Sequence, residues 1–215
     1  MYQIAIVADF VCPWCFIGKR RLERAVALVR AERPDFAYST QWKPFFLNPN
    51  TPPEGEPYLP FLIAKFGSQE AVEALFQRVR EAGEPYGLSY AFEKIALRAN
   101  TLQAHRLLRW AQRQGNADAL VERLFEAQFQ NGEAIGDKET LVRLAGECGY
   151  ERSAASAYLG SSEDVAELRA EEKSIRDLGI RLVPTFILPG NEVIVGAEDP
   201  RVLAAAILNQ LGVPA

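Results

Sequence analysis

Two cysteines, Cys12 and Cys15, are separated by two residues, and they lie between an apolar run and a segment of helical periodicity. A Cys-x-x-Cys pair in this position is typical of a dithiol redox site. Pro13 suits the first position of a helix, because proline has no N–H to leave unpaired and its φ is already helical. Cys12 is then the N-cap, where unpaired N–H groups and the helix dipole favour a thiolate, the nucleophile of disulfide exchange.

Cys15 is predicted to lie on the buried side of this helix. It falls one turn after the N-cap, on a stripe of small and apolar residues with helical spacing. The stripe comprises Cys15, Gly18, Leu22, Ala25, Val26 and Val29. We therefore expect Cys12 to be the exposed, attacking thiol and Cys15 to be the sheltered thiol that resolves a mixed disulfide.

The alternative chemistry for the pair is half of a zinc site. Zinc would need further ligands, and the other candidates, Cys148 and His105, are distant in sequence and lack a paired spacing. Cys148 also lies on the apolar stripe of its own predicted helix, which indicates a buried structural thiol. The sequence therefore favours redox chemistry and predicts no metal site.

The composition is that of an ordinary globular protein. The chain has 215 residues, of which 48% are hydrophobic and 24% charged, and a net charge of −4 that leaves no basic footprint for nucleic acid. Every long apolar run is interrupted by charge, so no membrane span is predicted. The first residues lack the features of a secretory leader. If Met1 is the true start we expect a cytoplasmic protein, although a mature periplasmic chain given a new methionine would look the same.

Strand and helix signals alternate towards both ends of the chain. The predicted strands are residues 2–9, 36–42, 183–188 and 192–195, and the predicted helices are residues 13–33, 163–178 and 200–211. The last two strands flank Pro189-Gly190-Asn191, which has the composition of a hairpin turn.

The middle of the chain has a different character. Residues 43–60 are rich in proline and form either a linker or a wall of a substrate cleft, and the periodicity from 69 to about 159 is helical. The order of elements predicts an α/β fold, a thioredoxin-like mixed sheet with an all-helical insertion. Its two halves are predicted at 1–54 and 163–215, with the insertion at 55–162.

Pro184 begins an otherwise apolar strand, where proline removes a hydrogen-bond donor of the sheet. In thioredoxin-like folds the peptide bond before the equivalent proline is cis, and the proline lies beside the dithiol. The backbone of the preceding residue, here Val183, is then free to pair with a substrate strand. The alternative is an edge-strand proline without a role, and the Cys-x-x-Cys context favours the cis form.

These motifs together resemble the DsbA-like superfamily of thiol–disulfide oxidoreductases, and within it the FrnE-like branch. The resemblance covers essentially the whole chain. It rests on residues 9–18, Pro44-Phe45-Phe46-Leu47-Asn48-Pro49, residues 100–107, Val183-Pro184-Thr185-Phe186 and Val195-Gly196-Ala197. It implies an attacking Cys12, a resolving Cys15 and a cis Pro184. The family often has glycine where this chain has Leu182, and that bulk would narrow the approach to the dithiol.

The same superfamily includes 2-hydroxychromene-2-carboxylate isomerases and kappa-class glutathione transferases. Those proteins typically have serine at the position that matches Cys12, where it assists glutathione. Because both sulfurs are present here, electron exchange is favoured, and a glutathione-dependent isomerase or transferase is the alternative. A binding module whose insertion holds a partner is a third reading of the same chain.

Further site residues are predicted less directly. Pro13, Trp14, Val183, Pro184 and His105 are the expected substrate contacts. His105, the one histidine of the chain, is either a proton shuttle or substrate contact near the site, or a residue of the helix surface.

Asp9, three residues before Cys12, either accepts a proton from Cys15 or is a turn residue, and the turn is favoured. The expected reaction passes through a mixed disulfide at Cys12. It needs no metal or organic cofactor, and glutathione is the candidate co-substrate. The expected substrates are protein or small-molecule thiols and disulfides, with no nucleic acid or membrane partner. A cytoplasmic location favours reduction.

Overall fold

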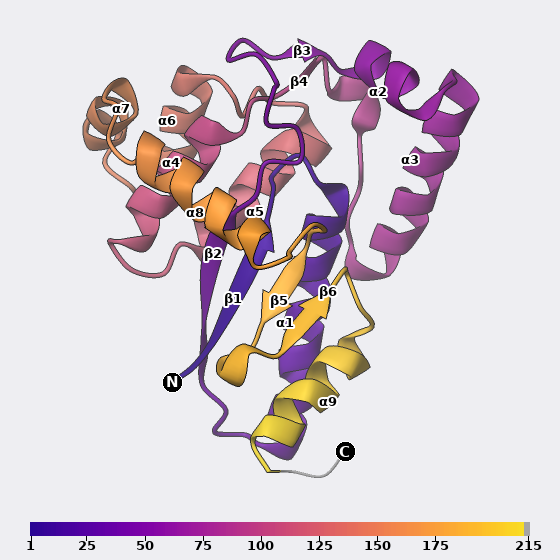
Figure 1. Cartoon of the computed structure of the whole chain (residues 1–215), viewed down its shortest axis with the longest axis vertical. Coiled ribbons are helices and arrows are strands. Elements are labelled where there is room, and N and C mark those ends of the chain that lie inside the picture. The colour runs from indigo at the N-terminus through magenta and orange to yellow at the C-terminus, as the bar shows by residue number, and fades with distance from the viewer. Residues whose placement is uncertain (213–215) are drawn as a thin grey trace.

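A four-stranded mixed sheet lies at the centre of the structure, a computed structural model that describes residues 1–212 (Figure 1). The strands are β1 (Tyr2–Ala8), β2 (Tyr38–Pro44), β5 (Thr185–Ile187) and β6 (Val193–Val195), in the order β2-β1-β5-β6. β1 pairs in parallel with β2 and antiparallel with β5, which pairs antiparallel with β6. The predicted mixed sheet is confirmed.

β1 is an interior strand of this sheet, with Ile4, Ile6 and Val7 at most 1% exposed. Helix α1 (Pro13–Glu32) returns the chain so that β2 lies parallel to β1. Pairing begins with Tyr2 opposite Tyr38. The second strand therefore starts two residues later than its side-chain alternation indicates.

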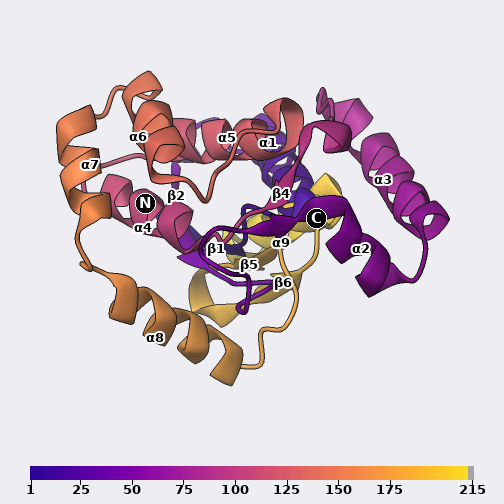
Figure 2. The same ribbon diagram turned by 90° about the horizontal axis from the view of Figure 1, so that it is seen from above.

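Helices cover both faces of the sheet. Seen from above, α8 (Val165–Asp177) lies on one side of the strands, and α1 and α5 (Asp118–Glu126) lie on the other (Figure 2). α9 (Pro200–Gln210) packs against α1. The helices predicted at 13–33, 163–178 and 200–211 are confirmed to within two residues. None of the helices described over residues 1–212 is long and apolar enough to cross a membrane.

The insertion is built mainly from helices. They are α2 (Tyr58–Phe66), α3 (Gln69–Gly83), α4 (Leu102–Gln112), α5, α6 (Lys138–Glu147) and α7 (Arg152–Gly160). The continuous helical region predicted over 69–159 is wrong for residues 84–101. Pro85 cannot continue α3 and Gly87 has a φ of +71°, so short 3-10 turns follow. A short antiparallel pair, β3 (Glu56–Pro57) with β4 (Leu97–Arg98), lies in the same region.

The insertion and the sheet share one hydrophobic core. The ring of Phe125 in α5 stacks on Phe16 of α1 with 5.1 Å between centroids, and it lies 6.2 Å from Trp42 of β2. Phe16 and Phe125 are fully buried. The helices of the insertion are thereby held at a fixed place over α1, where the two cysteines begin the helix.

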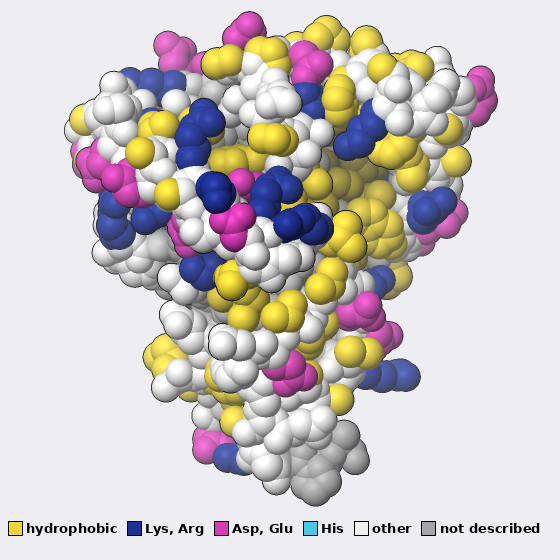
Figure 3. All heavy atoms as spheres, in the orientation of Figure 1, with side chains coloured by type: hydrophobic (Ala, Val, Ile, Leu, Met, Phe, Trp, Pro, Cys, Tyr) yellow, Lys and Arg dark blue, Asp and Glu magenta, His cyan; other side chains and the backbone are white. Residues whose placement is uncertain are grey.

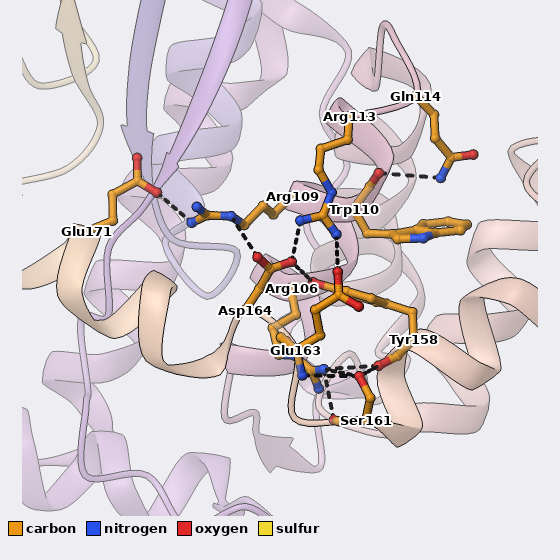
Figure 4. Close-up of polar contacts among 10 residues, drawn as sticks. All are labelled: Arg106, Arg109, Trp110, Arg113, Gln114, Tyr158, Ser161, Glu163, Asp164 and Glu171. Carbon is orange, nitrogen blue, oxygen red and sulfur yellow. Dashed lines mark hydrogen bonds and ion pairs between the residues drawn. The ribbon is translucent and has the colours of Figure 1, made fainter.

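Helix α4 is anchored to the corner between α7 and α8 (Figure 4). The Arg106 guanidinium, 1% exposed, donates to the carbonyl oxygens of Tyr158 and Ser161 at 3.0 and 2.9 Å. The Asp164 carboxylate accepts from the Tyr158 hydroxyl and from Arg113, each at 2.6 Å. Asp164 has a φ of +63°, a conformation that non-glycine residues seldom adopt. These bonds hold the corner and the position of α4.

Candidate active site

The first turn of α1 has the predicted geometry. Cys12 is the N-cap, with an extended backbone, and Pro13 is the first helical residue. The Asp9 carbonyl accepts the Cys12 N–H at 3.0 Å, which makes a tight turn between β1 and the helix. The Cys12 carbonyl in turn accepts the Cys15 N–H at 3.0 Å. Both sulfurs therefore lie within one helical turn at the end of β1.

Cys12 and Cys15 are free thiols, and both are buried. Cys15 is 1% exposed, as expected, but Cys12 is 5% exposed, so the prediction of an exposed attacking thiol is wrong for this structure. The cause is the segment before β5, because the Cys12 thiol donates to the Val183 carbonyl at 3.6 Å. The Val183 carbonyl therefore covers the Cys12 sulfur.

The peptide bond between Val183 and Pro184 is cis, as predicted. Pro184 packs directly on α1: a Cβ atom at Gly18 would lie 2.7 Å from its Cγ atom. Glycine at position 18 is what allows this close approach. The two motifs, more than 160 residues apart in sequence, thus meet around the dithiol.

Burial raises the pKa of the Cys15 thiol well above its usual range. The hydrogen bond and the charge of Cys12 raise it further, as does the charge of Asp9, while a backbone hydrogen bond from Asp9 acts the other way. Cys15 is therefore a thiol at rest, and it needs a proton acceptor before it can attack a mixed disulfide.

Asp9 and His105 form a buried pair behind the dithiol. The Asp9 carboxylate is 1% exposed, and its Oδ2 accepts the Leu47 N–H at 2.8 Å. Its Oδ1 lies 3.6 Å from His105 Nε2, and within the described chain neither of these two atoms has a hydrogen-bond partner. The His105 ring contacts Phe10 and Phe46 at centroid distances of 5.0 and 5.4 Å. Asp9 thus starts the predicted turn with its backbone, and His105 is buried rather than at the helix surface.

Tyr90 contacts the redox motif and was not singled out from the sequence. Its hydroxyl donates to the Pro13 carbonyl at 2.9 Å. Burial raises its pKa, and negative charge on Cys12 or Cys15 would raise it further, so the hydroxyl stays protonated. It lies in the irregular segment between α3 and α4, and no local pattern of the sequence marks it as a site residue.

The Tyr90 ring is held by two aromatic neighbours. It stacks on Phe92 with 5.3 Å between ring centroids and makes an edge contact with Phe129 at 5.5 Å. Phe129 belongs to a π-helical turn, Ala127–Asn131, that continues α5. The Phe129 carbonyl accepts the Ala91 N–H at 2.8 Å. The insertion thus presents a rigid aromatic wall to the first turn of α1.

The surface near the site is apolar at several points. Figure 3 shows hydrophobic side chains gathered in a hollow between α3 and the segment that leads into β5. Leu182, next to Val183, is 65% exposed, and Val195, paired with Thr185, is 43% exposed. The exposed Leu182 side chain is the residue directly before Val183, and its effect on the approach to the dithiol stays a prediction. Trp14 is half-buried and packs against the core.

The third thiol of the chain, Cys148, lies at the end of α6. Cys148 is half-buried, less than predicted, because it follows the last turn of α6, and its sulfur lies 3.6 Å from the Ala119 carbonyl. Over residues 1–212, no three His, Cys, Asp or Glu side chains are grouped closely enough to hold a metal ion.

Comparison with known proteins places this geometry in a family. Residues 3–208 match the family model of the DSBA-like thioredoxin domain. The uncharacterized protein YwbO of Bacillus subtilis is 27% identical over 211 residues, 97% of this chain and 96% of that protein. The crystal structure of a probable DsbA oxidoreductase from Streptomyces coelicolor has a TM-score of 0.89 at 29% identity, over 99% of this chain and 91% of that one.

A 2-hydroxychromene-2-carboxylate isomerase shares the fold as well. Its TM-score is 0.71 at 18% identity, over 97% of this chain and 96% of that chain. At that identity the likeness shows the fold alone, so the activity has to be argued from the site. With the family match spanning nearly the whole sheet and insertion, the chain belongs to the DsbA-like thioredoxin domain family.

Proposed function

We propose that this protein is a thiol–disulfide oxidoreductase that works through Cys12 and Cys15. The observation that carries the proposal is the pair of free thiols within one turn of α1, against the Val183 carbonyl and Pro184. A glutathione-dependent isomerase of the same fold would not need a second thiol at position 15. The buried resolving thiol therefore supports electron exchange over glutathione-assisted isomerisation.

The reaction begins with the Cys12 thiolate, which attacks one sulfur of a substrate disulfide. The other substrate sulfur leaves as a thiolate and takes a proton, and a mixed disulfide forms at Cys12. Cys15 then loses its proton and attacks the Cys12 sulfur, and the second substrate thiolate leaves. Two electrons pass from the dithiol to the substrate, and the reverse sequence oxidises a substrate dithiol.

Asp9 is the proposed acceptor of the Cys15 proton when Cys15 attacks the mixed disulfide. Its carboxylate is buried at the end of β1, and its charge acts on the Cys15 thiol. A thiol whose pKa is raised by burial needs a base in the same buried space, because solvent cannot reach it. Asp9 supplies a carboxylate oxygen, Oδ1, that no hydrogen bond occupies.

The Val183 carbonyl is the proposed backbone contact for a substrate strand, with Pro13, Trp14 and Pro184 beside it. It already accepts the Cys12 thiol, so it points at the reacting sulfur. Exposed apolar side chains nearby, Leu182 and Val195, favour substrates with apolar surface. Protein or small-molecule disulfides are the proposed substrates, glutathione the proposed co-substrate and the cytoplasm the proposed location; the FrnE-like branch remains a prediction.

The test is a redox titration of the purified protein in glutathione buffers, with differential alkylation of each cysteine read by mass spectrometry. The expected result is a reversible two-electron couple between Cys12 and Cys15, with Cys148 alkylated throughout. Its potential decides the direction, since a value near that of thioredoxin makes the protein a reductant. If no disulfide forms between Cys12 and Cys15 at any potential, the proposal is wrong, and that result would favour the glutathione-dependent isomerase.

A further inference from the structure

His105 contacts Asp9 and also lines a pocket of the molecule. Its Nε2 lies 3.6 Å from Asp9 Oδ1, and both atoms are buried without hydrogen-bond partners in the described chain. Buried polar atoms in folded proteins are nearly always paired, so two orphans facing each other mark a place where a proton is exchanged or held. Leu47, which bonds the other oxygen of Asp9, fixes the carboxylate in this orientation.

A pocket of about 900 Å³ lies between β2, α4 and α8, and His105 forms part of its lining. Its lining includes His105, Pro44, Leu108, Leu168 and Glu171. Among the described residues that line it, neither cysteine nor Pro184 is present. The pocket is therefore separate from the face on which a disulfide substrate binds, and it is large enough to hold water.

We propose that His105 carries protons between Asp9 and the water of this pocket, so that the dithiol exchanges protons with solvent by a path that the substrate does not block. This proposal rests on the proposed thiol–disulfide exchange. It assigns His105 to the reaction without any contact to substrate.

The proton balance is closed. Cys15 gives its proton to the Asp9 carboxylate as it attacks the mixed disulfide. Asp9 passes a proton to His105 Nε2, and the imidazolium releases its other ring proton, on Nδ1, to water in the pocket. One proton has moved from thiol to solvent and no electron is involved. When the active-site disulfide is reduced again, uptake runs the same steps backwards and restores the starting tautomer.

The position of His105 is held firmly enough for such a role. Arg106, the next residue, is tied to the corner between α7 and α8 by its bonds to Tyr158 and Ser161 (Figure 4). The ring itself is held between Phe10 and Phe46. Neither contact uses a ring nitrogen, so both nitrogens remain available for protons.

Other charged groups surround the pair. Arg98 of β4 lies close enough to Asp9 for the carboxylate charge to raise the pKa of the guanidinium, although burial lowers that pKa overall. Arg98 also forms an ion pair with Glu56. From α8, Glu172 accepts the Phe46 N–H and Arg176 donates to the Phe46 carbonyl. The Arg98 and Arg176 guanidinium groups have hydrogen-bond donors and no acceptor atom, and Glu172 is bonded to the backbone. His105 is the group beside Asp9 whose ring nitrogens can both accept and donate a proton.

The test measures the resolving step directly. Reduced protein is mixed with oxidised glutathione and quenched with acid, and mass spectrometry follows the mixed disulfide at Cys12 and its conversion to the Cys12–Cys15 disulfide. His105→Ala is expected to slow the conversion about tenfold or more. A tenfold loss is smaller than the usual effect of general acid–base catalysis, because His105 acts through Asp9. Formation of the mixed disulfide should not change, because attack by Cys12 does not use the relay.

Chemical rescue separates a proton role from packing. The His105→Ala cavity opens on the pocket, so added imidazole should restore the conversion rate, whereas pyrazole, a far weaker base of the same shape, should not. His105→Phe keeps an aromatic ring between Phe10 and Phe46, and it should be as slow as the alanine variant and resist rescue. Leu108→Ala, which widens the same pocket without removing a base, is the control and should convert at the wild-type rate.

Two results would overturn the relay while leaving the proposed function intact: equal conversion rates in wild type and His105→Phe, or rescue by pyrazole as effective as rescue by imidazole. If the wild-type protein forms the mixed disulfide but never the Cys12–Cys15 disulfide, the proposed function itself fails, and the relay fails with it.

Discussion

Helix α4 contributes to two buried polar clusters, one around Arg106 and Asp164 and one around Asp9 and His105. The two clusters differ in how completely their polar atoms are paired. Around Arg106 and Asp164, guanidinium, carboxylate and hydroxyl groups bond one another and the backbone at 2.6 to 3.0 Å. Around Asp9 and His105, one carboxylate oxygen and one ring nitrogen face each other at 3.6 Å with no partner in the described chain.

The difference follows from what each cluster does. A fully paired network has little to gain from moving a proton, and it stabilises one arrangement of helices. A cluster with free lone pairs costs stability, and it persists where protons must be transferred. The predictions below test whether the first cluster acts on stability alone and the second on rate alone.

The largest effect is expected at the reacting sulfur. Cys12→Ser should reduce disulfide exchange to background, because serine cannot form the mixed disulfide, and Cys15→Ser should accumulate mixed disulfides that are not resolved. Insulin reduction and non-reducing gels measure both. Cys148→Ser is the control and should exchange at the wild-type rate; if Cys12→Ser kept full activity, the assignment would be wrong.

Arg106→Ala should cost about 3 kcal/mol of unfolding free energy, since it removes charge-assisted hydrogen bonds and leaves buried carbonyl oxygens unpaired. Urea unfolding measures this. Arg109→Ala on the same helix should cost well under 1 kcal/mol, because its ion pairs with Asp164 and Glu171 are partly exposed. Exchange per folded molecule should be unchanged in Arg109→Ala, and equal losses of stability in the two variants would contradict the comparison.

Asp9→Asn should slow resolution of the mixed disulfide about tenfold or more with little loss of stability. The amide oxygen still accepts the Leu47 N–H, and a buried charge is removed. Quenched-flow kinetics and urea unfolding of the same sample give both values. Asp164→Asn should show the opposite pattern, lower stability at an unchanged rate, and the same pattern in both variants would remove the distinction.

Tyr90→Phe should cost about 1 kcal/mol, the usual contribution of one buried hydrogen bond, because the ring and its stacking on Phe92 remain. We also expect a measurable shift in the redox potential, since the hydroxyl bonds the Pro13 carbonyl inside the redox motif. Tyr158→Phe, which removes a hydroxyl bonded to Asp164, is the matched control and should leave the potential unchanged.

The smallest effects are expected in the pH dependence of stability. For Asp164, burial acts to raise the pKa, but the bonds from Tyr158 and Arg113 outweigh it and hold the pKa below its usual range. Its stabilisation is therefore present above the unfolded pKa and lost as pH falls through the folded value. The pKa of Cys15 is raised by burial, so its stabilisation is present below the unfolded value and lost as pH rises towards the folded one.

Urea unfolding from pH 3 to pH 10 measures these two arms. Asp164→Asn should flatten the acid arm, and Cys15→Ala should flatten the alkaline arm without affecting the acid one. An acid arm unchanged by Asp164→Asn would show that the corner between α7 and α8 does not owe its stability to the ionised carboxylate.

Much of the site was predictable because it depends on local chemistry. Proline suits the first position of a helix, and an apolar stripe with helical spacing follows it, so Cys12 as N-cap and the burial of Cys15 follow from residue type and spacing. The break at residues 84–101 was missed because periodicity alone outweighed Pro85 and Gly87, the residues that stop α3.

The exposure of Cys12 and the contacts of Tyr90 and His105 depend on long-range packing. Val183 covers the Cys12 sulfur, Tyr90 comes from an irregular segment, and His105 lies 96 positions from Asp9. No local pattern encodes such contacts, because they arise when β1, α4 and the irregular segment close around a common core.

The sequence by itself determined the family, the Cys-x-x-Cys pair at the start of α1 and the order of strands and helices, since each of these depends on neighbouring residues. Tertiary structure alone decided which side chains surround the sulfurs and which polar atoms remain unpaired. Burial and pairing are properties of the closed core: the Asp9 carboxylate is buried because β1 and α4 bring it against His105 and exclude water.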